Sequence, residues 1–179
     1  MSFHDETKKQ PRRLFCKEAL TLVLGGVSLL VPAGAGLSVF LDPLWRKTGG
    51  VSVRVAGWGD LPEDGSPRRF PVLADRTDAW NRYPQSAVGV VYLRRAGEKK
   101  VEALNAICPH AGGLIDFLPA RKCFVCPIHN SQFTPDGALA GSGSPSPRAM
   151  DSLPVELRGD DIWVTFHNFQ SGVRGKIPV

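Results

Sequence analysis

The sequence predicts an all-β protein, an antiparallel β domain preceded by one N-terminal transmembrane helix. Nineteen glycines and fifteen prolines against two methionines, in 179 residues, are typical of a turn-rich β fold. One uncharged stretch near the N-terminus is long enough to cross a membrane, and no second run of that length follows, which excludes a polytopic membrane protein. Residues 48–179 hold fifteen basic and thirteen acidic residues, so nucleic acid is not an expected partner.

A transmembrane anchor is predicted at residues 19–41, where 23 consecutive residues carry no formal charge. As a helix rising about 1.5 Å per residue, this stretch would reach roughly 35 Å and cross a hydrocarbon core of about 30 Å. Residues 1–17 hold five Lys or Arg against two acids, so the positive-inside rule leaves residues 1–18 in the cytoplasm. The β domain is therefore expected on the periplasmic, outer side of a bacterial inner membrane.

The segment before the anchor resembles a twin-arginine export signal, with the residues Arg12-Arg13-Leu14-Phe15-Cys16-Lys17. That pathway exports folded proteins, so the resemblance implies that a cofactor is inserted before export. Pro11 departs from the Ser or Thr usual at its position. Two alternatives stay open, namely arginines that supply only topology charge, and a signal cleaved at Ala33-Gly34-Ala35. The apolar run continues to Leu41, beyond the roughly 7–15 residues of a signal core, which favours an uncleaved anchor.

A hinge or tether is predicted at residues 42–50, before the β domain at 51–179. Trp45 suits the headgroup interface, and Thr48-Gly49-Gly50 offers a flexible joint. Loops are expected at 61–67 and 142–147, and a helical turn at 78–83 is left open. Alternating or β-branched runs predict strands at 51–56, 70–73, 88–93, 101–105, 153–158 and 162–166.

Two short motifs carry the expected metal chemistry, Cys108-Pro109-His110-Ala111-Gly112 and Cys126-Pro127-Ile128-His129-Asn130-Ser131. Two thiolates and two imidazoles could bind zinc, and a structural zinc domain without a redox role stays an alternative. Zinc fingers, however, group their ligands by type, whereas Cys and His alternate here. This pattern fits a [2Fe–2S] cluster with two Cys on one iron and two His on the other. The predicted ligands are Cys108, His110, Cys126 and His129.

The C-x-H and C-x-x-H motifs resemble those of Rieske iron–sulfur proteins. With the export signal, anchor and hinge in this order, the chain is most similar to the iron–sulfur subunit of bacterial quinol–cytochrome c oxidoreductases, the cytochrome bc complexes. The resemblance implies that the subunit takes one electron, coupled to a proton, from quinol and passes it to a c-type haem. It also implies cytochrome b and a c-type cytochrome as partners, the membrane as location, and His129 as the quinol contact.

The same resemblance suggests the cluster's surroundings. Ser144-Pro145-Ser146-Pro147 is similar to the proline-rich loop that covers the cluster, which brings Pro145 and Pro147 near Gly112 of the first motif. Ser131 stands where a serine bonds a bridging sulfide. Phe133 stands where many respiratory members have a tyrosine that bonds a ligand sulfur, so a lowered reduction potential is expected.

Departures from the family pattern concern the cysteines. Gly113 and Ile128 occupy the positions of two cysteines that form a disulfide in respiratory members, so that disulfide is not expected here. Cys123 is expected to be a buried thiol and Cys16 a free one.

Two other redox functions are alternatives for a Rieske domain. The small subunit of an arsenite-oxidase-type molybdoenzyme is also an exported Rieske protein, but it relays electrons from molybdenum and binds no quinol. A soluble Rieske ferredoxin or oxygenase component is disfavoured by the predicted anchor.

Overall fold

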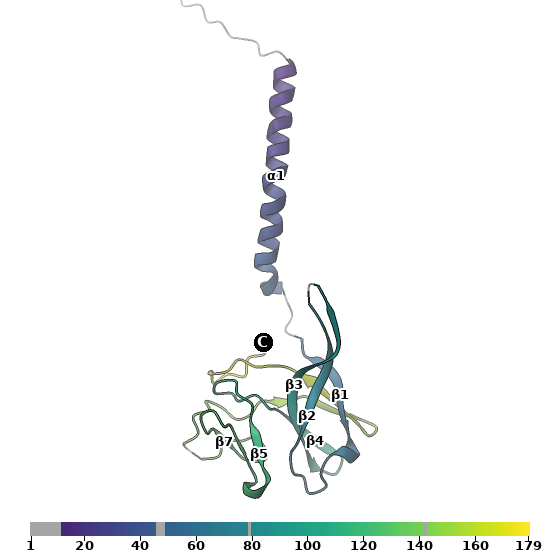
Figure 1. Ribbon diagram of the computed structural model, residues 1–179, viewed down its shortest axis with the longest axis vertical. Coiled ribbons are helices and arrows are strands. Elements are labelled where there is room, and N and C mark those ends of the chain that lie inside the picture. Colours follow the sequence, from purple (N-terminus) through teal and green to yellow (C-terminus); the bar gives the residue numbers. More distant parts are fainter. Residues whose placement is uncertain (1–11, 46–48, 79, 142) are drawn as a thin grey trace, which may run out of the picture. The chain divides into compact units, whose positions relative to one another are not determined.

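The computed structural model describes residues 12–45, 49–78, 80–141 and 143–179, without the side chains of Arg12, Arg13 and Pro43. The chain divides into two compact units, Met1–Lys47 and Thr48–Val179. The first contains one helix and the second contains the strands (Figure 1). The side chains of the arginine pair, on which the export signal depends, lie outside the described residues.

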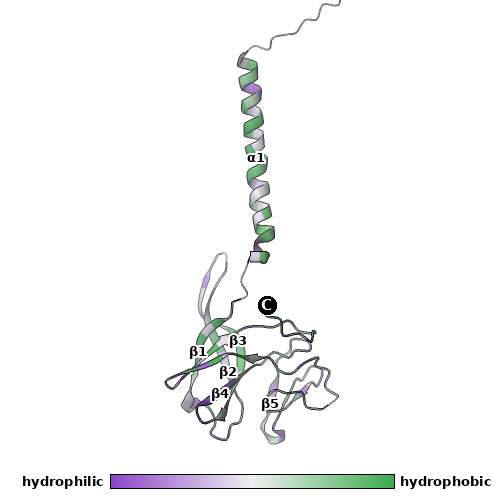
Figure 2. Cartoon of the chain, turned by 180° about the vertical axis from the view of Figure 1, so that it is seen from behind, coloured by the Kyte–Doolittle hydropathy of each residue, from purple (hydrophilic) through white to green (hydrophobic). Residues whose placement is uncertain are grey.

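Helix α1 spans Arg12–Trp45, and its segment Leu14–Asp42 is long and apolar enough to cross a membrane. Hydrophobic residues occur along its whole length (Figure 2). The hydroxyls of Thr21 and Ser38 donate to backbone carbonyls of their own helix at 2.9 and 2.8 Å, which satisfies them without water. The helix continues past the predicted end at residue 41, because Asp42 ends the apolar run but not the backbone hydrogen bonding. Residues 42–45 of the predicted hinge are therefore helical.

The strands described in the second unit form three antiparallel sheets, which confirms the predicted fold class. The first sheet, in the order β1-β10-β9, contains β1 (Val51–Gly57), β9 (Val155–Arg158) and β10 (Asp161–Phe166). The second, in the order β2-β3-β4-β8, contains β2 (Arg68–Thr77), β3 (Arg82–Gly97), β4 (Lys100–Asn105) and β8 (Ser152–Leu153). The third, in the order β5-β6-β7, contains β5 (Asp116–Leu118), β6 (Cys123–Val125) and β7 (Gln132–Phe133). Two short 3₁₀ helices are η1 (Trp58–Asp60) and η2 (Pro119–Arg121).

Two clusters of buried side chains hold these sheets together. The first joins residues of the first two sheets, including Val72, Val91 and Ile162. Gly89 allows the sheets to approach, because a side chain there would overlap the ring of Phe166. The second cluster joins the second and third sheets and includes the rings of Tyr92, Phe124 and Phe133 with both motif cysteines, Cys108 and Cys126. Both cysteines of the predicted metal site are therefore part of a packed core.

Several predicted strand boundaries are wrong, and each error has a local cause. The strands predicted at 70–73 and 88–93 are the inner parts of the long β2–β3 hairpin. The strand predicted at 153–158 is two strands in different sheets, because Pro154 has no N–H to continue a ladder. Among the described residues of 78–83 there is no helix; Asp78 closes a hairpin turn. The third sheet was not predicted, since strands of two or three residues show no periodicity.

The predicted flexible joint is only partly free of the β unit. Thr48 lies outside the described residues. Gly50 is packed so closely that a side chain there would overlap the ring of His167. Gly49 has no such neighbour among the described residues. Gly50 therefore belongs to the packed β unit.

Candidate metal centre

The first motif forms a loop between β4 and β5. Asn105, buried at the end of β4, donates from its amide to the carbonyl of His167 at 2.8 Å and accepts from the N–H of Ile107 at 2.9 Å. The N–H of Cys108 then donates to the carbonyl of Gly113 at 2.7 Å. The N–H of Gly112 donates back to the carbonyl of Cys108 at 2.9 Å, with Gly112 at φ 76°. Glycine suits this left-handed position because it has no Cβ.

The second motif repeats this hydrogen-bond pattern between β6 and β7. The N–H of Cys126 donates to the carbonyl of Ser131 at 2.8 Å, and the N–H of Asn130 donates to the carbonyl of Cys126 at 2.9 Å. Asn130 has φ 57°, the left-handed conformation that Asn tolerates better than most residues. In both loops the left-handed residue comes four positions after the cysteine. The same two backbone hydrogen bonds therefore recur in both loops.

The two loops bring the four predicted ligands together. Cys108 and Cys126 are buried in the same core cluster. The rings of His110 and His129 meet edge to face, with centroids 4.8 Å apart and planes at 72°. His110 is half-buried and His129 is exposed. The thiols thus lie on the inner side of the site, while one imidazole is open to solvent.

Two buried polar atoms at this site lack hydrogen-bond partners among the described residues, Nδ1 of His110 and Oγ of Ser131. Buried polar groups are nearly always paired, so both atoms indicate a missing acceptor or ligand. Burial raises the pKa of the Cys108 thiol above its ordinary value, and a hydrogen bond from the backbone of His110 opposes that shift. Since metals bind thiolates, loading the site would release a proton from Cys108. The donors fit a group that takes two sulfur and two nitrogen ligands.

The donor arrangement also bears on metal number. Cys108 and Cys126 lie together in one core cluster, and the rings of His110 and His129 are adjacent to each other. A zinc ion in a closed structural site takes four protein ligands, whereas each iron of a mixed-ligand [2Fe–2S] cluster takes two. The two loops present one pair of thiols and one pair of imidazoles, as a mixed-ligand [2Fe–2S] cluster requires.

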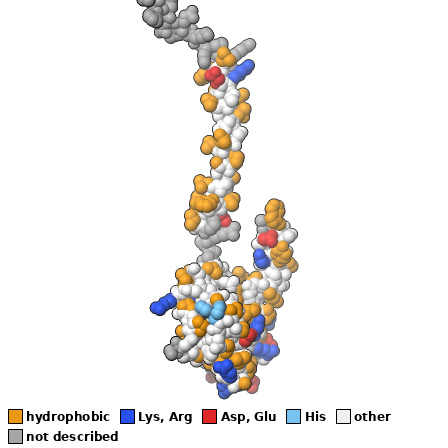
Figure 3. Space-filling model, turned by 60° about the vertical axis from the view of Figure 1, so that its left-hand side comes forward, with side chains coloured by type: hydrophobic (Ala, Val, Ile, Leu, Met, Phe, Trp, Pro, Cys, Tyr) orange, Lys and Arg blue, Asp and Glu red, His pale blue; other side chains and the backbone are white. Residues whose placement is uncertain are grey.

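Exposed apolar side chains, here called the apolar rim, lie on the two ligand loops and on the segment 143–147. Leu114 is 42% exposed and Ile128 is 57% exposed, which is high for large aliphatic side chains. Pro145 is exposed and Pro147 half-buried in the segment 143–147, which forms a loop as predicted, residue 142 lying outside the described part. Histidine side chains reach the surface of the β unit (Figure 3). The ligand loops therefore expose large apolar side chains together with the His129 imidazole.

The cysteines agree in part with expectation. All four are described, and none forms a disulfide. A Cβ on Gly113 would overlap the end of the Ile128 side chain, so Ile128 fills the space between the two loops. Cys123 is half-buried rather than buried, because in strand β6 it points to the face opposite that of the next residue, the fully buried Phe124. Phe133 is fully buried in β7, in the core cluster that contains Cys108 and Cys126.

One functional contact was missed from the sequence, the ion pair of Arg148 and Asp151. Their side chains are 10% and 5% exposed and meet through two hydrogen bonds of 2.9 and 2.7 Å. Arg148 also donates to the carbonyls of Gln170 and Val173. Between these two residues, Gly172 donates its N–H to the carbonyl of Pro109 at 2.8 Å. Arg148 thereby holds the C-terminal segment against the first ligand loop.

An antiparallel β unit whose two loops each present one thiol and one imidazole defines a class of iron–sulfur domains with mixed ligands. Comparison with known families agrees: the Rieske [2Fe-2S] domain matches residues 53–154, more than half of the chain. The chain belongs to the Rieske [2Fe-2S] domain family. Its cofactor is a [2Fe–2S] cluster, and the structural zinc hypothesis is set aside.

Curated relatives include iron–sulfur subunits of cytochrome b6-f complexes. The chloroplast protein of Volvox carteri is 30% identical over 149 residues, which cover 81% of this chain and 69% of that protein. The chloroplast protein of Pisum sativum is 28% identical over 168 residues, which cover 84% of this chain and 63% of that protein. The chain thus spans less than two thirds of the pea protein's length.

A similar solved structure is the plasma membrane Rieske protein PetC3 from Synechocystis PCC 6803. It is 22% identical, with a TM-score of 0.46, and the match covers 64% of this chain and 99% of that chain.

Proposed function

We propose that this protein is the membrane-anchored Rieske subunit of a cytochrome bc complex, which oxidises quinol and reduces a c-type haem. The observation that carries this proposal is the exposed imidazole of His129 beside the apolar side chains of Leu114 and Ile128. A quinol has an apolar ring with hydroxyl groups at its edge. Such a molecule needs both an apolar surface and a hydrogen-bond acceptor, and this rim offers both.

The ligand assignment is part of the proposal. Cys108 and Cys126 would hold one iron, and His110 and His129 the other. For His110 the buried and unpartnered Nδ1 is the atom available to iron, which leaves its other ring nitrogen outward. When bound, the cluster supplies a one-electron acceptor.

The remaining roles fall to the protein's own groups. The outward ring nitrogen of His129 would bond the quinol hydroxyl and accept its proton. Pro145 and Pro147 would limit the access of water to the ligands. The Ser131 hydroxyl, which is buried and has no hydrogen-bond partner among the described residues, would donate to the cluster's sulfur.

The domain would travel between quinol and haem by a pivot in the tether. Because Gly50 is packed against His167, we place this pivot within residues 46–49. Cytochrome b and a c-type cytochrome are then the expected partners. The orientation has the N-terminus in the cytoplasm and the β unit on the periplasmic side of a bacterial inner membrane.

Purification of the full-length protein from membranes tests this function. We expect cytochrome b and c-type haem to copurify, and the complex to reduce a c-type cytochrome when quinol is added. Copurification with a molybdoprotein, and no quinol-dependent reduction, would support the arsenite-oxidase-type alternative instead.

The potential of the cluster is expected to respond to one added hydroxyl. Phe133 is fully buried with the ligand cysteines and has no hydroxyl to donate to a ligand sulfur. Because a hydrogen bond to sulfur stabilises the more negative reduced state, Phe133→Tyr should raise the midpoint potential by about 20–70 mV. Redox titration at fixed pH measures the shift. The control is Phe70→Tyr, in the other core cluster, which should leave the midpoint unchanged. An unchanged or lower midpoint in Phe133→Tyr would contradict the argument.

Export is expected to depend on the arginine pair itself and not on its charge. Changing both Arg12 and Arg13 to Lys keeps the charge but removes the pair, so the protein should stay on the cytoplasmic side. Protease accessibility of the β unit from the periplasm measures this. The matched control changes Lys8 and Lys9 to Arg, which should be exported normally. Normal export of the Arg12→Lys, Arg13→Lys variant would mean that the arginines supply topology charge only.

A further inference from the structure

The β2–β3 hairpin projects from the β unit as an arm that the proposed electron transfer does not use (Figure 1). At its turn Trp80 is 91% exposed, and Tyr83, the second residue of β3, is also exposed. Apolar side chains gather at the outer end of this arm (Figure 3). Trp and Tyr combine an apolar ring with a polar group, and both are enriched where protein meets the membrane–water interface.

The turn that presents Trp80 is ordered. The Asp78 carboxylate accepts from the N–H of Trp80 at 2.9 Å and from the N–H of Asn81 at 2.7 Å. These hydrogen bonds hold the pKa of Asp78 below its ordinary value. Below the turn, Asp75 and Arg82 form an ion pair at 2.6 Å across the two strands. The indole is therefore displayed by a defined turn.

The outer half of the arm carries balanced charge. Two acids, Asp75 and Asp78, face two bases, Arg76 and Arg82. A tip with no net charge is not repelled electrostatically by a zwitterionic lipid surface, and its aromatic rings suit the membrane–water interface. The tip therefore suits binding to the lipid headgroup region better than binding to a strongly acidic or strongly basic protein surface.

The arm projects at the end of the β unit where the chain arrives from the anchor. Gly49 and Val51 line a groove together with the segment from Ala74 to Thr77. The other end of β1 lies at the opposite end of the unit, where Arg95 donates to the carbonyl of Trp58 at 3.1 Å. Trp80 thus lies about four residues farther along the arm than the segment that lines this groove with Gly49 and Val51. Four residues of strand correspond to about 13 Å.

The tether keeps this tip within reach of a bilayer. Residues 46–50 separate the end of α1 from β1 and span at most about 18 Å when fully extended. Trp45, the last residue of α1, is itself exposed and suited to the headgroup layer. The length of these residues therefore leaves Trp80 able to reach the same layer.

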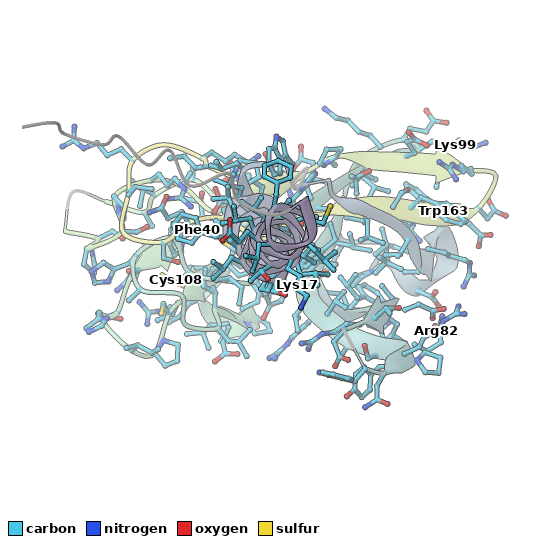
Figure 4. All side chains as sticks on the ribbon, turned by 90° about the horizontal axis from the view of Figure 1, so that it is seen from above. Lys17, Phe40, Arg82, Lys99, Cys108 and Trp163 are labelled. Carbon is cyan, nitrogen blue, oxygen red and sulfur yellow. The ribbon has the colours of Figure 1, made fainter. Side chains whose placement is uncertain are left out.

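We propose that the tip of the β2–β3 hairpin is a second membrane-contact site, in which Trp80 and Tyr83 enter the headgroup region of the bilayer that holds α1. The proposal rests on the proposed membrane anchoring. Cys108 and Arg82 lie on opposite sides of the β unit, so a contact at the hairpin tip leaves the ligand loops uncovered (Figure 4). It restricts the rotation of the domain about its tether.

Fluorescence quenching by lipid tests the contact. The full-length protein is placed in phosphatidylcholine nanodiscs whose acyl chains are brominated near the headgroup, and emission is compared with unbrominated nanodiscs. The chain has four tryptophans. Trp80→Phe should lose about half of the bromine-dependent quenching, with Trp45 supplying the rest. The matched control is Trp163→Phe, whose ring lies under the Arg158 guanidinium at 4.5 Å and should not contribute.

The outcomes separate this contact from the anchoring. Equal quenching in the Trp80→Phe variant and the wild type, with loss in Trp45→Phe, would overturn the hairpin contact and keep the anchor. Absence of any bromine-dependent quenching would overturn both. A change in Trp80 emission that requires added cytochrome subunits, with no quenching by brominated lipid, would overturn the membrane contact in favour of a protein contact.

Discussion

Replacing His129 or Cys126 with alanine should abolish the cluster. In the proposed ligand set, either change leaves one iron with a single protein ligand. The first motif, with Cys108 and His110, has no further thiol or imidazole that could replace the lost ligand. Because backbone hydrogen bonds shape both loops, the altered loop should still fold, and the loss should be a ligand effect. We expect no Rieske EPR signal and loss of bound iron in anaerobically purified, full-length protein.

The matched control for Cys126 is Cys123, a half-buried thiol three residues earlier in the chain. Cys123→Ala should keep the full signal and iron content. A normal Rieske signal in His129→Ala or Cys126→Ala would contradict the ligand assignment. Loss of signal in Cys123→Ala as well would mean that the strand β6, and not the ligand, is what these changes disturb.

Replacing Arg148 with methionine should cost about 3–5 kcal/mol of unfolding free energy, because Asp151 would keep a buried and uncompensated charge. The change also leaves the carbonyls of Gln170 and Val173 without this donor and frees the C-terminal segment from the first ligand loop. Urea denaturation of the full-length protein in detergent, followed by circular dichroism, measures the loss.

Two further variants separate charge burial from packing. Arg54→Met breaks an ion pair with Asp161 whose side chains are 55% and 44% exposed, and it should cost no more than about 1 kcal/mol. Adding Asp151→Leu to Arg148→Met removes the uncompensated charge and should recover part of the loss. Equal costs for Arg148→Met and Arg54→Met would show that the buried pair does not stabilise the fold as argued.

The functional class was predictable because its signals are local. A [2Fe–2S] site of this kind needs one thiol and one imidazole two or three residues apart, and that spacing is visible without any fold. The apolar run of the anchor is likewise continuous in sequence, and α1 contains all of residues 19–41. Alternation and turn residues predicted the all-β class, although Pro154 divided one predicted strand and hairpin pairing lengthened two others.

The sequence alone therefore determined the type of cofactor and the class of the fold, since both depend on neighbours in the chain. The tertiary structure decided what surrounds the ligands. Asn105 and His167 are 62 residues apart in the chain, yet their hydrogen bond supports the first ligand loop. Ile128 fills the space beside Gly113 only because two separate loops converge. The display of Trp80 on a projecting arm also depends on register and packing between distant segments, and no local pattern of residues encodes such contacts.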